Sequence, residues 1–167
     1  MFIAHLPSGY LLARYLYKRI QPSNISKKMF YSAVLIGAVF PDFDLFYFYL
    51  IDNRAVHHHK YFMHWFWFWI PIFLVAITWL KISQFKSKCA TILSLFSGAV
   101  LMHICLDTFV GDVWLFMPFI DKPYVFFEVN PRYQPWWVNF VFHWSFGVEL
   151  VLCLYALYQF KVRKSIN

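Results

Sequence analysis

Residues 92–111 read ILSLFSGAVLMHICLDTFVG, an apolar run long enough to cross a bilayer that nevertheless holds His103 and Asp107. A membrane-spanning helix needs about 20 mainly apolar residues. Imidazole and carboxylate side chains are costly inside a membrane and by default mark a functional site there. This stretch therefore predicts a membrane helix that carries part of a polar site.

The rest of the chain is similarly apolar. Of its 167 residues, 61% are hydrophobic, 24% are aromatic and only 14% are charged, whereas a soluble domain has about 25% charged residues. These proportions exclude a disordered tail protein and a coiled coil, and they predict one integral-membrane domain over residues 1–167. The net charge of +7 does not indicate nucleic-acid binding, because the basic residues lie between apolar runs, as in membrane proteins.

Five apolar runs predict an all-α, polytopic membrane bundle of about five transmembrane helices. The runs cover residues 2–17, 29–51, 62–80, 92 to about 119, and 137–160. The first is short or re-entrant, and whether it spans the membrane is left open. The fourth contains Gly111 and Asp112, so we expect its helix to end near Gly111 and residues 112–120 to return along the membrane interface.

The basic residues predict the orientation of these helices. Ten of the 15 Lys and Arg residues fall in two loops with their flanks, residues 18–28 and 81–88, and in the tail from residue 161 onward. Short loops rich in Lys and Arg stay in the cytoplasm. With alternating spans, the N-terminus is then outside and the C-terminus is cytoplasmic.

In this topology, most ionisable residues within or beside the apolar runs fall toward the outer side. They are His5, Asp42, Asp44, His57, His58, His59, His64, His103, Asp107 and His143. They come from separate segments of the chain. The sequence therefore predicts that potential ligands converge near one leaflet.

Two spacings sharpen this prediction. His103 and Asp107 are four residues apart, so they share one helix face and can hold one metal ion; the alternative is a hydrogen-bonded pair that joins two helices. Asp42 and Asp44 are two apart and point to different sides of a regular helix. They can face one site only if Pro41 distorts the backbone; the alternative is one Asp capping a broken helix.

The remaining candidates are less specific. His59 and His64 are five residues apart, so we expect them to meet at one ion only if a helix begins between them. The alternative for residues 57–59 is an exposed loop without ligands. His143 and Glu149 are expected to be structural or to support the ligands.

Imidazole combined with carboxylate favours Zn²⁺, with Mn²⁺ or Fe²⁺ as alternatives. The candidate metal ligands are His5, Asp42, Asp44, His59, His64, His103 and Asp107. This is more than one tetrahedral ion uses, so we expect one or two ions. Two ions would activate water and stabilise a phosphoester during hydrolysis. The candidate catalytic residues are three of these ligands together with a lysine: Asp42, Asp44, His64 and Lys60. A further group is expected to support the ligands or to contact substrate: His58, Arg54, Arg132, His143 and Glu149.

The order of these motifs resembles the YdjM-like family of inner-membrane, metal-dependent hydrolases, also described as LexA-binding. The resemblance covers residues 5–118 and rests on the His5 segment, the Pro-Asp-x-Asp block at residues 41–44, the His block at residues 59–64 and the His-x-x-x-Asp pair. Where the family reads His-Arg-Gly-x-Thr-His-Ser, this chain reads HKYFMHW from His59. Both histidines are kept, while Gly, Thr and Ser are lost. The resemblance implies a bacterial inner-membrane protein with hydrolase activity.

Together these features predict a metal-dependent hydrolase of a lipid head group or lipid-linked phosphoester, with its site facing the periplasm. A soluble substrate would not require a site embedded at the outer leaflet, and Lys60, Arg54 or Arg132 would neutralise phosphate charge. The alternatives are a metal-dependent deacylase or deacetylase of a lipid-linked substrate, an ion transporter and a non-catalytic metal-binding scaffold. We expect no nucleic-acid partner. The head group and the oligomeric state are left open.

Overall fold

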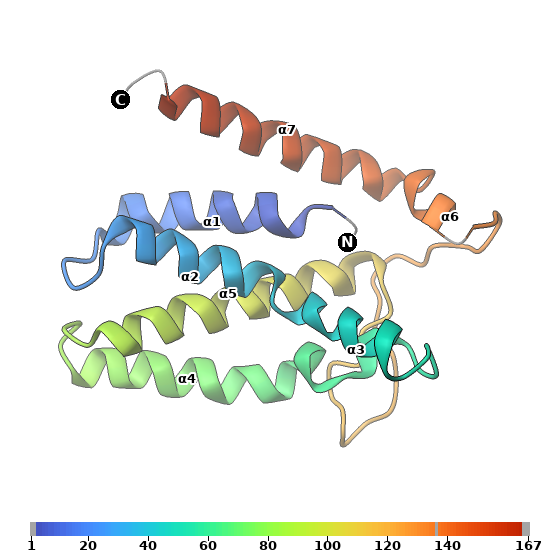
Figure 1. Cartoon of the computed structure of the whole chain (residues 1–167), viewed down its shortest axis with the longest axis horizontal. Helices are drawn as coiled ribbons and strands as arrows, with labels where there is room; N and C mark the ends of the chain where they lie inside the picture. Colours follow the sequence, from blue (N-terminus) through green and yellow to red (C-terminus); the bar gives the residue numbers. More distant parts are fainter. Residues whose placement is uncertain (1–2, 136, 165–167) are drawn as a thin grey trace.

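The computed structural model describes residues 3–135 and 137–164, so residue 2 of the first apolar run lies outside the described residues. The described residues contain helices and turns but no strand, which confirms the all-α prediction (Figure 1). The helices are α1 (His5–Ile20), α2 (Lys27–Val39), α3 (Asp44–Leu50), α4 (Phe66–Ile82), α5 (Lys88–Val110), α6 (Trp137–Val141) and α7 (Trp144–Lys164). Three short 3₁₀ turns accompany them: η1 (Pro41–Phe43), η2 (His58–Lys60) and η3 (Phe62–His64).

The second apolar run is broken at Pro41. Proline lacks the backbone N–H that would continue the helical hydrogen bonding, and α2 ends at Val39 before the turn η1 begins. The axis from α2 to the segment Pro41–Leu50 bends by 54°. The backbone distortion expected at Pro41 is therefore present.

The core of the bundle is formed around α5, which packs against α2 on one side and α4 on the other, while α1 packs on α2. Small residues allow these helices to approach closely, as is common in membrane proteins. Gly37 shows how tight the α2–α5 contact is, because a Cβ atom there would lie 2.4 Å from the Phe96 carbonyl oxygen. In contrast, α7 packs mainly on α1 and exposes many large apolar side chains.

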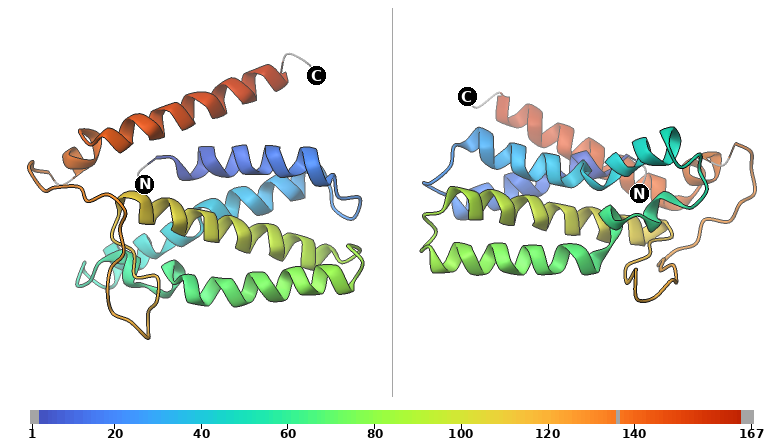
Figure 2. Two further views of the ribbon diagram at one scale, coloured as in Figure 1. Left: turned by 180° about the vertical axis from the view of Figure 1, so that it is seen from behind. Right: turned by 60° about the horizontal axis from the view of Figure 1, so that its bottom comes forward.

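The two ends of the bundle differ in charge. The loops α1–α2 and α4–α5 lie at one end together with the end of α7, whereas α3, the turns η2 and η3 and the segment 111–135 lie at the other (Figures 1 and 2). We call these the basic end and the site end. All eight acidic residues lie in the segments of the site end or in the halves of α5 and α7 next to it: Asp42, Asp44, Asp52, Asp107, Asp112, Asp121, Glu128 and Glu149. The orientation of the two ends in the membrane stays a prediction.

Within the described part of the chain, length and composition identify two helices able to cross a membrane, Lys88–Val110 and Trp144–Val162, or three if the bent pair α2–α3 counts as one span. The apolar helix α4 has 17 residues and α1 has 16, which correspond to about 25 Å each. A helical membrane protein is thus supported, whereas the count of five spans and its orientation stay predictions.

Two helix boundaries differ from the sequence prediction. The third run begins with the turn η3, and α4 starts only at Phe66. The Trp65 indole donates to the Lys60 carbonyl and the Trp69 indole to the Met63 carbonyl, both at 2.8 Å, and these bonds hold the turns against the start of α4. The last run is divided into α6 and α7. As expected, α5 ends at Val110 with Gly111 as its cap.

Candidate metal centre

Four histidines surround the carboxylate of Asp107, which is 2% exposed near the end of α5. The Nε2 atoms of His103, His64 and His59 lie 2.9, 3.5 and 3.7 Å from its Oδ2 atom. The Nε2 atom of His5 lies 2.9 Å from its Oδ1 atom. These histidines come from α1, α5 and two 3₁₀ turns, so the fold brings together residues that are far apart in sequence.

The opposite nitrogens of two of these rings are held by backbone carbonyls. His103 Nδ1 donates to the Ala38 carbonyl at 2.7 Å, and His59 Nδ1 donates to the Asp112 carbonyl at 2.6 Å. Because a carbonyl only accepts, the proton must lie on Nδ1 and the lone pair of a neutral ring on Nε2. Metal-binding histidines typically show this arrangement, since the outer hydrogen bond fixes the ring and its tautomer.

The carbonyl of Ala38 is available for a structural reason. It lies in the last turn of α2, where backbone carbonyls have no partner within the helix. The break at Pro41 therefore both ends the helix and supplies an acceptor that orients His103.

For the third ring, that of His64, the acceptor that holds Nδ1 is a carboxylate and not a backbone carbonyl. His64 Nδ1 donates to Asp44 Oδ2 at 2.6 Å, and both side chains are buried. Burial alone would lower the pKa of His64, but the nearby carboxylates of Asp107 and Asp44 outweigh it and raise the pKa to about 9. Without a cation His64 is therefore protonated at neutral pH, and a metal ion would replace that proton.

The two carboxylates of the Pro-Asp-x-Asp block both reach this cluster. Asp42 Oδ1 lies 3.6 Å from His103 Nε2, and the Asp42 side chain is 34% exposed. Asp44 contacts His64 and also approaches His58, whose Nδ1 lies 3.4 Å from Asp44 Oδ1. The turn η1 replaces regular helix here, so residues two apart can face one site.

The donor set fits a divalent cation. One ligand atom from each of Asp42, His64, His103 and Asp107 lies within 4.8 Å of the others, and the same holds for Asp44, His58 and His64, and for His57, His58 and His59. The buried Nε2 atoms of His64 and His103 make no hydrogen bond within the described residues. The lone pair of a neutral His103 ring faces a carboxylate, which is unfavourable unless a cation lies between them, and in the protonated His64 ring the Nε2 proton would give way to that cation. His64 is shared by the first two groups, which is compatible with one ion or two.

The helix expected to begin between His59 and His64 is present as the short 3₁₀ helix η3, which starts at Phe62. The α-helix α4 starts only at Phe66, after both histidines. The successive turns η2 and η3 instead bring their ring centroids to 4.5 Å. Gly111 leaves room for His59, since a Cβ atom there would lie 3.2 Å from His59 Cε1. Burial lowers the pKa of His59 well below its ordinary value and keeps the imidazole neutral.

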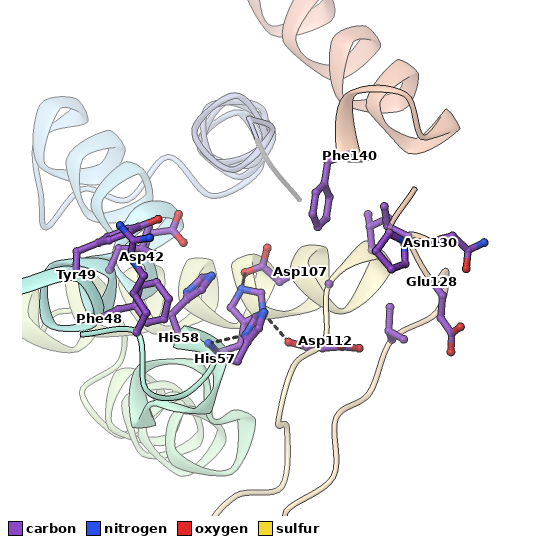
Figure 3. Close-up of a pocket in the computed structure, with 18 residues that line it drawn as sticks. Asp42, Phe48, Tyr49, His57, His58, Asp107, Asp112, Glu128, Asn130 and Phe140 are labelled. Carbon is purple, nitrogen blue, oxygen red and sulfur yellow. Dashed lines mark hydrogen bonds and ion pairs between the residues drawn. The ribbon is translucent and has the colours of Figure 1, made fainter. Parts of the chain in front are cut away.

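A cavity of about 860 Å³ borders the cluster (Figure 3). Asp42, Asp107 and residues 57–59 form its wall on the side of the cluster. The rest is lined by α3, by residues 110–112, 125 and 128–131, and by Phe140 of α6. The cavity has the size of a small-molecule site.

The predicted basic residues occupy different places. Arg54 lines the cavity. Lys60 does not: its Nζ atom pairs with Asp121 at 2.8 Å and lies 5.2 Å from the centre of the Trp114 ring. Arg132 is held through its backbone N–H, which donates to Asn139 Oδ1, and it is also not among the lining residues.

His143 and Glu149, the two candidates near α7 that were expected to support the ligands, make different contacts. His143 Nδ1 hydrogen-bonds with Ser145 Oγ at 2.8 Å, and His143 is in none of the described ligand groups. Glu149 is 2% exposed, and its Oε2 atom accepts the backbone N–H groups of Ile3 at 2.6 Å and Ala4 at 3.2 Å. It therefore fixes the residues that precede His5.

Sequence reasoning missed three contributors, namely the carbonyls of Ala38 and Asp112 and the small size of Gly111. Side-chain patterns do not report backbone acceptors. The one available signal was Gly111-Asp112 directly after the helix that carries Asp107, since a helix end beside a ligand exposes backbone groups.

The comparisons with known proteins agree with this architecture. No curated protein and no solved structure matches the chain. A family model described as YdjM inner membrane protein matches residues 1–165. This match extends the motif resemblance through α7, and the chain belongs to the YdjM inner membrane protein family.

Proposed function

We propose that the protein is a metal-dependent hydrolase of a lipid head group or lipid-linked phosphoester at the periplasmic leaflet of a bacterial inner membrane. One observation carries the proposal: the Nε2 atoms of His59, His64 and His103 converge on Asp107 while their Nδ1 atoms are held by oxygen acceptors. A buried arrangement of this kind is typical of a metal centre.

Asp42, His64, His103 and Asp107 would hold the ion, with His5 and His59 beside them. Zn²⁺ suits this set best, and Mn²⁺ or Fe²⁺ are the alternatives. A bound cation would lower the pKa of a coordinated water and neutralise charge on a phosphoester. Asp42 and Asp107 both belong to this group and line the cavity, and Asp42 is the more exposed of the two, at 34% against 2%, so its carboxylate is placed to accept a proton from water.

The surface near the site supports a lipid substrate. Phe116, Phe119, Ile120 and Phe126 belong to the segment at the site end and are 43–75% exposed. Exposed aromatic and aliphatic groups of this kind suit a membrane interface. A lipid head group would then lie at the level of the cavity.

The orientation can be tested with thiol labelling. Cys89 is an exposed native thiol at the basic end, and Lys122→Cys places another in the segment at the site end. We expect a membrane-impermeant maleimide to label the Lys122→Cys variant in intact cells, and Cys89 only after permeabilisation. Labelling of Cys89 in intact cells would refute the periplasmic assignment.

The central experiment measures metal content by elemental analysis after gentle purification in detergent. We expect one or two Zn²⁺, Mn²⁺ or Fe²⁺ ions per chain in the unmodified protein and none in His103→Ala. His143→Ala is the matched control, because it removes a histidine outside the ligand groups, and it should keep its metal. Absence of metal from the unmodified protein after add-back would refute the metal centre and favour a protein without catalytic metal.

The reaction is identified by its products. Phospholipids and lipid-linked phosphoesters are incubated with the metal-loaded protein, and released phosphate-containing head groups are measured beside released acids. Phosphoester cleavage supports the proposal, whereas release of acetate or fatty acid would replace it with a deacetylase or deacylase, since a metal-activated water also attacks carbonyls.

A further inference from the structure

The cavity beside the metal-ligand cluster has charged groups of opposite sign on its two sides. Among the residues that the structure describes, Arg54 is the one Lys or Arg that lines it, and Asp112 and Glu128 are the two acidic lining residues outside the ligand groups. Such a distribution is informative about substrate, because a bound molecule must complement both sides.

The positive side is next to α3. The Arg54 guanidinium lies over the Tyr49 ring, 4.8 Å from its centre, and makes no ion pair with any residue that the structure describes. The nearby Lys60 is already paired with Asp121. Among the candidates for phosphate recognition, Arg54 is therefore the one presented to the cavity, and a guanidinium binds phosphate oxygens in a bidentate manner.

The negative side is formed by the segment after α5. Figure 3 shows Tyr49 and Asp42 on one side of Asp107, and Asp112 and Glu128 toward the other. Over the described parts of the chain, the Glu128 side chain has neither a hydrogen bond nor an ion pair, and Asp112 is bonded through its backbone carbonyl to His59. Asp112 and Glu128 both line the cavity and are exposed to solvent.

The buried cluster gives an independent reason to expect a ligand here. His64 is fully buried, and its Nε2 atom points to Asp107, which forms part of the cavity wall, without making a hydrogen bond among the described residues. The reacting group of a substrate would therefore lie beside this cluster, between Arg54 on one side of the cavity and the carboxylates of Asp112 and Glu128 on the other.

We propose that the cavity recognises a head group that carries both a phosphate and a primary ammonium, as phosphoethanolamine does. The phosphate lies beside Arg54 and the cluster, and the ammonium lies between Asp112 and Glu128. An uncharged glycerol or a second phosphate in place of the ammonium would leave both carboxylates unpaired. This inference rests on the proposed function, since it specifies the substrate of the same site.

Binding is measured separately from hydrolysis, by calorimetry on metal-loaded protein in detergent with glycerophosphoethanolamine and glycerophosphoglycerol, and each mixture is then analysed for products. We expect the first to bind about tenfold more tightly, which is the scale of one charge-assisted contact. Glu128→Gln should remove this preference while still binding both ligands, and Arg54→Gln should weaken both. Arg132→Gln, outside the cavity lining, is the matched control and should behave as the unmodified protein.

Short-chain phosphatidylethanolamine, added below its micelle concentration, separates a lipid from a free head group as the source. Tighter binding than that of glycerophosphoethanolamine supports the lipid, whereas equal binding indicates a soluble phosphate ester and overturns the membrane source. Equal affinity for the two glycerophosphodiesters, a preference for the glycerol form, or no binding of either overturns the inference. A preference without any hydrolysis would refute only the proposed function, and hydrolysis without a preference would refute only the head-group assignment.

Discussion

The basic end and the site end of the bundle are built from the same helices in different ways. At the basic end, α2 and α5 begin at ordinary serine caps, Ser26 and Ser87. The loops there are joined by a neutral side chain, since Asn24 Nδ2 donates to Thr91 Oγ1 at 2.7 Å and to the Ser87 carbonyl at 3.1 Å. At the site end, α2 breaks and two 3₁₀ turns precede α4. The α-helix is interrupted at this end because residues two or five positions apart do not share one face of a regular helix, and here such residues reach one site.

Cavities show the same contrast. The basic end has a cavity of about 590 Å³, but most of its lining is aliphatic or aromatic, and its polar members are neutral. The cavity at the site end is bordered by histidines and carboxylates. Size alone therefore does not distinguish a functional site; the buried titratable groups do.

The largest loss of metal affinity is expected at the site end, when Asp107 is replaced with Asn. Removing an outer hydrogen-bond partner of a metal ligand costs about 10- to 100-fold in metal affinity, so loss of the carboxylate that four histidines approach should cost more than about 100-fold. Chelator competition on purified protein measures this affinity.

The matched change at the basic end is Asn24→Ala. It removes two hydrogen bonds, each worth about 1 kcal/mol of stability, and should leave metal affinity unchanged. Equal loss of metal in both variants would show that the site responds to general destabilisation, and it would contradict the assignment of Asp107.

The second prediction concerns pH. The carboxylates of Asp107 and Asp44 raise the pKa of His64 to about 9 against the opposing effect of burial, so the metal-free protein binds a proton there at pH 7. Metal binding must displace that proton. Apparent metal affinity should therefore rise about tenfold per pH unit from pH 7 toward pH 9 and then level off.

Chelator titrations at pH 7, 8 and 9, corrected for the chelator's own protonation, test this slope. Asp44→Asn should flatten it, because the amide no longer favours the protonated ring. An affinity that is independent of pH between 7 and 9 in the unmodified protein would show that His64 is not a metal ligand.

Asp44 also decides between one ion and two. If it only orients His64 through the 2.6 Å hydrogen bond, Asp44→Asn should keep the stoichiometry and weaken binding about 10- to 100-fold. If it is itself a ligand with His58, the number of ions per chain should halve. Elemental analysis at saturating metal separates these results, and an unchanged affinity and stoichiometry would exclude both roles.

Some of this site was predictable from sequence because it depends on residue type and local spacing. The shared face of His103 and Asp107 follows from helical periodicity, and the break at Pro41 follows from the missing N–H. The end of α5 near Gly111 is of the same kind. These features need no knowledge of the neighbouring helices.

Other parts depend on contacts between distant segments and could not be predicted in this way. The Ala38 carbonyl meets a ring 65 residues later, and Lys60 pairs with Asp121 across 61 residues. The turns η2 and η3 are held by indole hydrogen bonds to backbone carbonyls. The number of spans depends on the tilt of α1 and α4 in lipid, which sequence length does not determine.

The smallest expected effect tests the packing of the site end. In Gly111→Ala, the new Cβ atom would lie 3.2 Å from His59 Cε1 and 3.3 Å from the Asp107 carbonyl oxygen. The backbone there is extended, with φ of −126°, so it accepts alanine, and the His59 ring and the Asp107 carbonyl need to shift by only a few tenths of an ångström. Because the hydrogen bond from His59 Nδ1 to Asp112 would be strained without being lost, metal affinity should fall by about three- to tenfold, less than when an outer partner is removed. Gly147→Ala is the control, since a Cβ atom there meets nothing within 4 Å. If both variants bind metal equally, His59 is not held in place by Gly111, and its position beside Asp107 depends on the turn η2 alone.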